Sequence, residues 1–313
     1  IISAFIGSSL TTLLDDLEKN IKAGKMTPQD KTELKLNIGK IPQILLDNTD
    51  RNRTSPFAFT GNKFEFRAVG SSDNCASPMV VLNTIVANQL MDFKNRVDAL
   101  ISKGKEKDTA IREVLRKDLT SCKKVIFGGN GYSEEWVKEA KKRGLKNTRH
   151  SAEALAAYMS ESSVELFTKL GIFSHKELEA RTEIRYESFC LTIELESKVL
   201  TEMIQNMVIP SAIRYQSRIA DNVSKLLNIG LSKDQVSAQI DLLNQLSSLI
   251  NSAQALNNKL SAQVDKAMES EHAKDRALVL NSKVKPLFEE IRAVSDEIER
   301  LCDDSDWALP KYR

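Results

Sequence analysis

Apolar residues at regular intervals near the end of the chain constrain the fold more than any other feature of the sequence. Over residues 236–264 they recur about every 3.5 residues, the period at which helices pack side by side in coiled coils. This first stripe comprises Val236, Ile240, Leu243, Leu246, Ile250, Ala253, Leu256, Leu260 and Val264. A second stripe steps by three and four residues through Val284, Leu287, Ile291, Val294, Ile298 and Leu301. Both stripes predict a core between helices, and a groove for a partner helix is the alternative.

The stripes belong to a predicted bundle of three long helices over residues 174–313. The first helix covers about 174–228, with a kink at Pro210 because proline removes a backbone hydrogen bond. Gly230 is expected to end this helix. The second helix covers about 232–269, and the third is clearest near its end. Short connections between the helices favour antiparallel neighbours.

The bulk composition excludes several classes of protein. The 313 residues include 45 basic and 43 acidic side chains, a net charge of +2 that favours neither nucleic acid nor a membrane surface as partner. No apolar run approaches the roughly 18 residues of a membrane span. The four cysteines are too far apart for a zinc or disulfide framework and fit a reducing compartment. We therefore expect a cytoplasmic protein. These cysteines are Cys75, Cys122, Cys190 and Cys302.

The beginning of the chain has a mixed pattern. We expect a strand over residues 1–6, an amphipathic helix over about 9–22, and two short strands at 56–60 and 63–69. The dipeptide between these two strands, Gly61-Asn62, is a hairpin signal. The predicted fold class is therefore α+β, with short antiparallel strands and helices first and a mainly helical region after them.

Helical periodicity begins near residue 74 and continues to the bundle. Helices are predicted over 80–102 and 109–121, and one or two short helices over 151–170. A glycine-rich turn at 128–131 precedes a helix that Ser133 can cap. We divide the chain into residues 1–90 with strands and helices, a helical continuation over 91–173, and the long-helix bundle over 174–313.

Three charged residues on the second strand of the hairpin are the best candidates for chemistry. Alternate side chains of a strand point to opposite faces, so Lys63, Glu65 and Arg67 share one face and Phe64 and Phe66 the other. We expect the two phenylalanines to anchor the strand in a core. A carboxylate between two cations can hold a metal ion and a phosphate together. The alternative is a solvated charged face whose charges neutralise one another.

The residues around this strand carry a resemblance to a known family. Asn52-Arg53-Thr54 is followed by the pair Glu65 and Arg67, and the whole stretch over 47–72 resembles the glutamine synthetase family in its type III branch. The close match covers about 47–90. A looser one continues through the glycine-rich turn at 128–133 to the segment 307–312. The resemblance implies that residues 1–90 are the C-terminal part of the catalytic domain.

The resemblance also implies roles for individual side chains. Glu65 matches a glutamate that binds the divalent cation on the phosphate side, Mg²⁺ or Mn²⁺. Arg67 matches an arginine that contacts the glutamate substrate and the transferring phosphoryl group, and Arg53 one that stabilises the phosphates. Lys63 falls where type I enzymes carry an arginine near the nucleotide, although lysine lacks the bidentate fork. At Ala58, type I enzymes have a second arginine.

The activity implied by the resemblance is that of glutamate–ammonia ligase in glutamine biosynthesis and nitrogen metabolism. ATP phosphorylates glutamate to γ-glutamyl phosphate, and ammonia displaces the phosphate. The implied assembly is a homo-oligomer of stacked rings, a dodecamer. Two alternatives are a related ligase that uses another amine and a non-catalytic helical scaffold.

The beginning of the chain supports one further expectation. Because the sequence starts at Ile1 inside a strand pattern, we expect it to be the C-terminal part of a longer polypeptide. The resemblance then places most active-site residues upstream. This chain alone is expected to be inactive.

Overall fold

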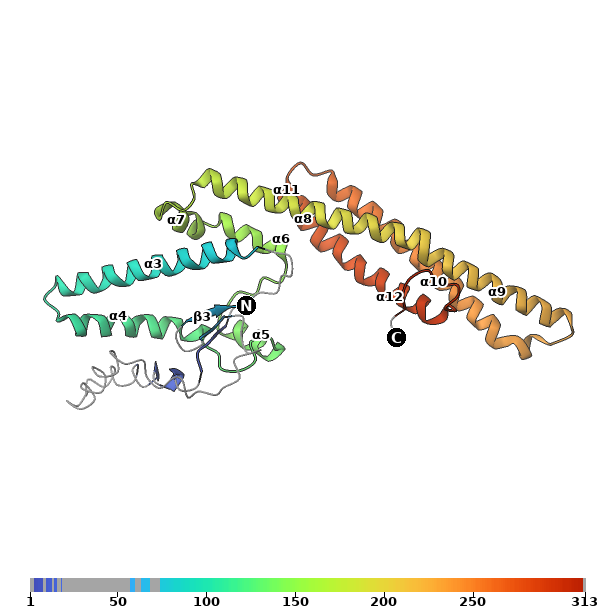
Figure 1. Ribbon diagram of the computed structural model, residues 1–313, viewed down its shortest axis with the longest axis horizontal. Helices are drawn as coiled ribbons and strands as arrows, with labels where there is room; N and C mark the ends of the chain where they lie inside the picture. Colours follow the sequence, from blue (N-terminus) through green and yellow to red (C-terminus); the bar gives the residue numbers. More distant parts are fainter. Residues whose placement is uncertain are drawn as a thin grey trace. The chain divides into compact units, whose positions relative to one another are not determined.

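The computed structural model describes residues 3–7, 10–12, 14–15, 18, 57–59, 63–67 and 74–311 of the chain. The chain forms two compact units. The N-terminal unit contains Ile1–Arg149 and Glu165–Ile172, and the C-terminal unit contains His150–Val164 and Phe173–Arg313. The segment predicted as a helical continuation, 91–173, is therefore shared between the two units. Figure 1 shows the elements of both.

A small sheet of three strands opens the N-terminal unit. The strands are β1 (Ala4–Phe5), β2 (Phe57–Phe59) and β3 (Phe64–Phe66), in that order. β2 and β3 are antiparallel, which confirms the predicted hairpin pairing. β1 pairs with β2 in parallel, so the sheet is mixed and not entirely antiparallel. The predicted connector at 61–62 and the predicted helix at 19–22 lie outside the described residues, whereas the described residues between 10 and 18 are helical.

The rest of the N-terminal unit is helical. Its elements are α3 (Ala76–Ile101), α4 (Lys107–Cys122), the 3-10 turn η2 (Lys123–Val125) and α5 (Glu134–Lys142). α3 and α4 pack together through Val97, Ala110 and Val114. Ser133 caps α5 as predicted, because its Oγ accepts a hydrogen bond from the backbone N–H of Trp136 at 3.3 Å.

Most of the C-terminal unit consists of long helices, and α7 is divided between the two units. The elements are α6 (Ser151–Ala154), η3 (Leu155–Met159), α7 (Glu161–Lys169), α8 (His175–Met203), η4 (Ile204–Val208), α9 (Ile209–Asn228), η5 (Lys233–Val236), α10 (Ser237–Met268), α11 (Ala273–Val279), η6 (Leu280–Val284) and α12 (Lys285–Leu301).

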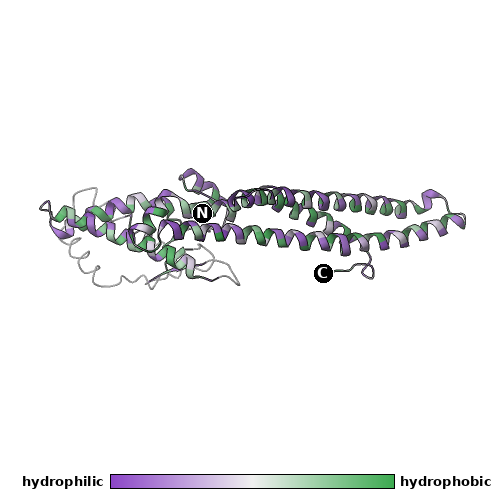
Figure 2. Ribbon diagram, turned by 90° about the horizontal axis from the view of Figure 1, so that it is seen from above, coloured by the Kyte–Doolittle hydropathy of each residue, from purple (hydrophilic) through white to green (hydrophobic). Residues whose placement is uncertain are grey.

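The two apolar stripes form the core of this unit, as predicted. α10 packs against both α9 and α12. Leu246 and Leu260 of the first stripe and Ile298 of the second are completely buried. Figure 2 shows apolar and polar residues alternating along the long helices, with the pattern expected when one side of each helix is buried. Gln216 of α9 donates a hydrogen bond to Ser247 of α10 across this contact at 2.6 Å.

In the C-terminal unit, a π-helical turn precedes each of the two prolines of the long helices. The segment η4 ends two residues before Pro210, where a kink was predicted, and η6 ends two residues before Pro286. Proline has no N–H, so the carbonyl four residues earlier loses its usual partner, and the wider turn accommodates this loss. Beyond α9, Gly230 adopts φ +100° and ends the helix as expected.

A buried polar residue lies among the apolar residues of α10. Asn257 is 1% exposed, and neither its Oδ1 nor its Nδ2 has a hydrogen-bond partner among the described residues. Ser247 of α10, which accepts the hydrogen bond from Gln216, lies ten residues before Asn257. Gln216 in turn lies ten residues after Asn206, which belongs to η4. In an antiparallel pair this places Asn257 at the level of η4. A buried amide without hydrogen-bond partners lowers the stability of the folded protein. The best-attested reason for keeping such a residue is that it fixes the register of packed helices.

Replacing Asn257 by leucine is therefore expected to stabilise the C-terminal unit by about 1–2 kcal/mol. Urea unfolding of the parent and the variant measures this difference. The neighbouring substitution Asn258→Leu is the matched control, because Asn258 is exposed and the change should stay within about 0.5 kcal/mol. A loss of stability in Asn257→Leu would show that the amide makes favourable interactions in the folded protein.

The cysteines divide into two exposed and two buried residues. All four are free thiols, with Cys75 and Cys122 at the surface. Burial raises the pKa of the Cys302 thiol to about 11 and also raises the pKa of Cys190. The buried pair is thus held in the unreactive thiol form. None of the helices that the structure describes is long and apolar enough to cross a membrane.

Candidate functional site

The charged row on β3 is placed by its pairing with β2. Glu65 is opposite Ala58, which is in turn opposite Phe5 of β1. Residues directly opposite one another point to the same side of a sheet, so these three share one face. Phe5 and Ala58 are almost completely buried on that face. The Glu65 side chain, 39% exposed, therefore lies at the border between the covered part of the sheet and solvent.

The opposite face of the hairpin carries four phenylalanines. Phe64 stacks on Phe57 with ring centroids 4.8 Å apart and lies 5.2 Å from Phe59. Phe64 and Phe66 are nevertheless 47% and 39% exposed. The prediction that these two residues anchor the strand in a core is wrong for this chain, because the buried face of the sheet is the one with Phe5 and Ala58.

Glu65 lies between the two cations, as the alternation of the strand predicts. Arg67 Nη2 donates a hydrogen bond to Glu65 Oε2 at 3.1 Å, and Lys63 Nζ lies 3.8 Å from Oε1. The Arg67 side chain is 26% exposed and that of Lys63 is 65% exposed. Pairs this accessible to solvent add little to stability. The geometry fits both a binding row for a metal and a phosphate and a face whose charges neutralise one another.

The remaining predicted site residue, Arg53, lies outside the described residues, as do its neighbours Asn52 and Thr54. The described residues contain no group of three or more His, Cys, Asp or Glu side chains that could hold a metal ion. A hard cation such as Mg²⁺ takes about six oxygen ligands. Glu65 fits such an ion as one ligand, and the others would have to come from elsewhere.

The fold and the row define a class: an α+β protein with a small mixed sheet, a carboxylate flanked by cations on an exposed strand, and a long helical region. Comparisons with known proteins narrow this class. The family described as the glutamine synthetase C-terminal domain matches residues 110–227.

Relatives of the whole chain carry the same name. The chain is 41% identical to a glutamine synthetase of Bacteroides fragilis (strain YCH46) and 35% identical to a type-3 glutamine synthetase of Dictyostelium discoideum. A glutamine synthetase of Butyrivibrio fibrisolvens is 33% identical. All of this chain is covered in each comparison, against 43%, 42% and 43% of the three relatives.

The chain thus carries the C-terminal domain of the glutamine synthetase family, and the predicted resemblance to the type III branch is confirmed. It spans about two fifths of the length of the curated relatives that it matches. The looser similarity predicted beyond residue 90 is supported by the family match over 110–227.

Proposed function

We propose that this chain contributes to a type III glutamine synthetase, which uses ATP to join glutamate and ammonia through γ-glutamyl phosphate. The observation that carries the proposal is the row Lys63–Glu65–Arg67. It combines a metal-binding type of side chain with two cations, at the positions where the resemblance requires them. The relatives over the whole chain support the same family of ligases.

Each side chain of the row has a proposed role that follows from its chemistry. Glu65 would be one ligand of Mg²⁺ or Mn²⁺, and the bound metal would neutralise charge on the phosphates. Arg67 would turn its guanidinium fork from Glu65 toward the substrate carboxylate and the phosphoryl oxygens. Lys63, the most exposed of the three, would contact the nucleotide phosphates. Arg53 is proposed to stabilise the phosphates during transfer.

The row supplies part of an active site. A general base must remove a proton from the attacking ammonium, and further carboxylates must complete the metal site. We propose that these groups belong to a longer polypeptide that works in the cytoplasm as a ring-shaped homo-oligomer, the dodecamer implied by the resemblance. In this proposal the bundle of the C-terminal unit braces the assembly or the catalytic strands. Removal of 231–304 should therefore impair assembly or activity.

The amine that the enzyme uses decides between the proposed ligase and its alternatives. The measurement is phosphate release from Mg-ATP and glutamate by the full-length protein carrying this chain. The reaction is run with ammonium, methylamine or a polyamine. We expect release that depends on ammonium. Release with another amine alone would assign a related γ-glutamyl amide ligase, and equal background with every amine would favour the helical scaffold.

A further inference from the structure

The helix α8 carries apolar residues on two opposite sides. Its buried side packs into the C-terminal unit through residues such as Leu178, Tyr186 and Ile193. On the other side lie four large apolar side chains that are 53–61% exposed: Ile184, Leu191, Leu195 and Val199. Apolar residues on both sides are typical of a helix that is covered on both sides. Within the part of the chain that the structure describes, only one side of α8 is covered.

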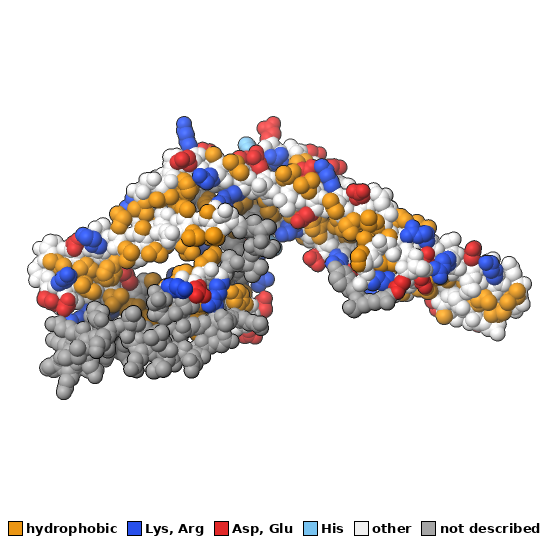
Figure 3. Space-filling view, viewed as in Figure 1, with side chains coloured by type: hydrophobic (Ala, Val, Ile, Leu, Met, Phe, Trp, Pro, Cys, Tyr) orange, Lys and Arg blue, Asp and Glu red, His pale blue; other side chains and the backbone are white. Residues whose placement is uncertain are grey.

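The four exposed residues form one continuous stripe. At 3.6 residues per turn, steps of seven, four and four residues keep them within an arc of about 80° around the helix. Between Ile184 and Leu191 the stripe passes over a small residue, Ser188. Figure 3 shows apolar side chains at the surface over α8, among charged side chains of both signs. The stripe is about 22 Å long at 1.5 Å per residue, which is enough to pack against one more helix.

Two charged residues on one flank of the stripe indicate which helix this is. Glu187 and Lys198 are eleven residues apart, about three turns, and so lie on the same flank. Both are exposed, and Lys198 also pairs with Glu194 of its own helix at 2.6 Å. In a parallel pair of identical helices each charge would lie against its own copy and repel it. In an antiparallel pair, Glu187 of each copy lies near Lys198 of the other.

From this pattern we infer that α8 binds α8 of a second copy of this chain, antiparallel, through the exposed stripe. The two-fold axis passes at the level of residue 193. Leu191 of one copy is then level with Leu195 of the other. Glu187 comes within one residue of the level of Lys198, so the contact combines leucine packing with two ion pairs. Such a contact closes on two copies. The inference rests on the proposed function in one respect, because it names a surface that joins copies in the proposed homo-oligomer.

Disulfide cross-linking of the full-length protein tests the contact and its direction. Two versions with different tags, one with Leu191→Cys and one with Leu195→Cys, are co-expressed in a background with Cys75→Ser and Cys122→Ser, which removes the exposed thiols of this chain. The two new thiols are level in the antiparallel pair, so a disulfide should link the two tagged chains.

The matched control for the cross-link uses Glu196→Cys in place of Leu195→Cys. Glu196 is exposed and lies at nearly the same level, but about 100° further around the helix, so it should not link to Leu191→Cys. No link between the two stripe positions, or an equal link with the control, would overturn the inference. Linkage of Leu191→Cys to its own copy alone would also overturn it, because that result requires parallel helices.

Exchanging the two charges tests what selects the second copy. Glu187→Lys and Lys198→Glu should each raise the concentration at which the pairs dissociate at least about tenfold, because like charges then face each other. The variant with both changes should recover most of the loss. Lys117→Glu is the matched control and should change nothing. Lys117 is as exposed as Lys198 and also pairs with a glutamate four residues away, but it lies in α4.

The masses of the particles in solution, measured on dilution and without substrates, report the pairing independently of the ligase activity. Unchanged dissociation in both single variants, or no recovery when the two changes are combined, would overturn the inference. Phosphate release by the same samples tests the proposed function separately. A parent protein that releases phosphate but stays monomeric at every concentration would contradict the inference and leave the ligase in place.

Discussion

Replacing Glu65 by glutamine in the full-length protein is expected to lower ammonium-dependent phosphate release about a hundredfold or more. The amide keeps the shape of the side chain and removes the charge that a hard cation requires. It also takes from Arg67 the carboxylate that holds it at 3.1 Å. Loss of one interaction that stabilises charge in a transition state typically costs a factor of about 10²–10³ in rate. The measurement is the rate at saturating substrates over a range of Mg²⁺ concentrations, and the variant should need more Mg²⁺.

The same substitution should leave the fold intact, which separates a lost ligand from a lost structure. The two ion pairs of Glu65 are partly exposed, so the free energy of unfolding should change by less than about 1 kcal/mol. Glu194→Gln is the matched control, because Glu194 also pairs with a lysine, Lys198 at 2.6 Å, but lies in α8. We expect that control to keep full activity. If Glu65→Gln retains the parent rate and the parent Mg²⁺ dependence, the row on β3 is structural.

The helical part of the fold could be predicted because its signals are local and repeated. A stripe such as the one from Val284 to Leu301 fixes the buried side of a helix without knowledge of its partner. A kink at Pro210 was predicted from the missing N–H, and the structure has a π-helical turn just before this proline. Pro286 carries the same signal, but no kink was predicted there, because the apolar steps of the third helix continue across this proline from Val284 to Leu287.

The covered face of the sheet could not be predicted from local sequence signals. Alternation along 63–67 correctly put Glu65 between Lys63 and Arg67, but it could not say which face of the strand is covered. That depends on β1, a distant segment whose Phe5 is buried on the same face as Ala58. The prediction that Phe64 and Phe66 are buried was therefore wrong, because the covered face of the strand is the one that carries Glu65.

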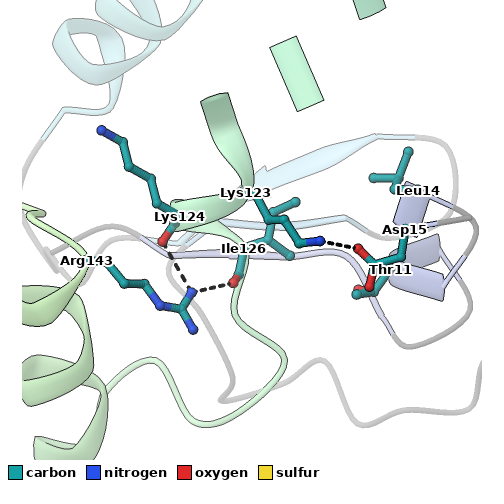
Figure 4. A pocket seen from close by; sticks show the side chains of 7 residues that line it. All are labelled: Thr11, Leu14, Asp15, Lys123, Lys124, Ile126 and Arg143. Carbon is teal, nitrogen blue, oxygen red and sulfur yellow. Dashed lines mark hydrogen bonds and ion pairs between the residues drawn. The ribbon is translucent and has the colours of Figure 1, made fainter. Parts of the chain in front are cut away.

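The sequence analysis also missed Arg143, which lines a cavity of about 390 Å³ in the N-terminal unit (Figure 4), and its partners explain why. Two of its hydrogen bonds go to backbone carbonyl oxygens, at residues 124 and 126, and these leave no trace in side-chain spacing. Its pair with Glu139 looks like any exposed pair four residues apart on a helix. One signal was present: Trp136 and Arg143 are seven residues apart, about two helical turns, and so lie on the same side of a helix that is otherwise rich in charge.

Truncating that tryptophan, by Trp136→Ala, is expected to destabilise the N-terminal unit by about 3–5 kcal/mol. The Trp136 side chain is completely buried, and its ring stacks on Phe127 at 4.3 Å. It also supports the guanidinium of Arg143. The substitution removes the burial, the stacking and that support together. Hydrogen exchange followed by mass spectrometry should show faster exchange in peptides from α4 and α5 and no change in α10 and α12, which belong to the other unit.

Trp136→Phe is the control that separates the volume of the ring from the support of Arg143. Phenylalanine keeps an aromatic face for Phe127 and for the guanidinium, so the loss of stability should be clearly smaller than in Trp136→Ala. Equal stability of the alanine variant and the parent would mean that this cluster does not hold the N-terminal unit together. Faster exchange in α10 and α12 would mean that the two units unfold as one.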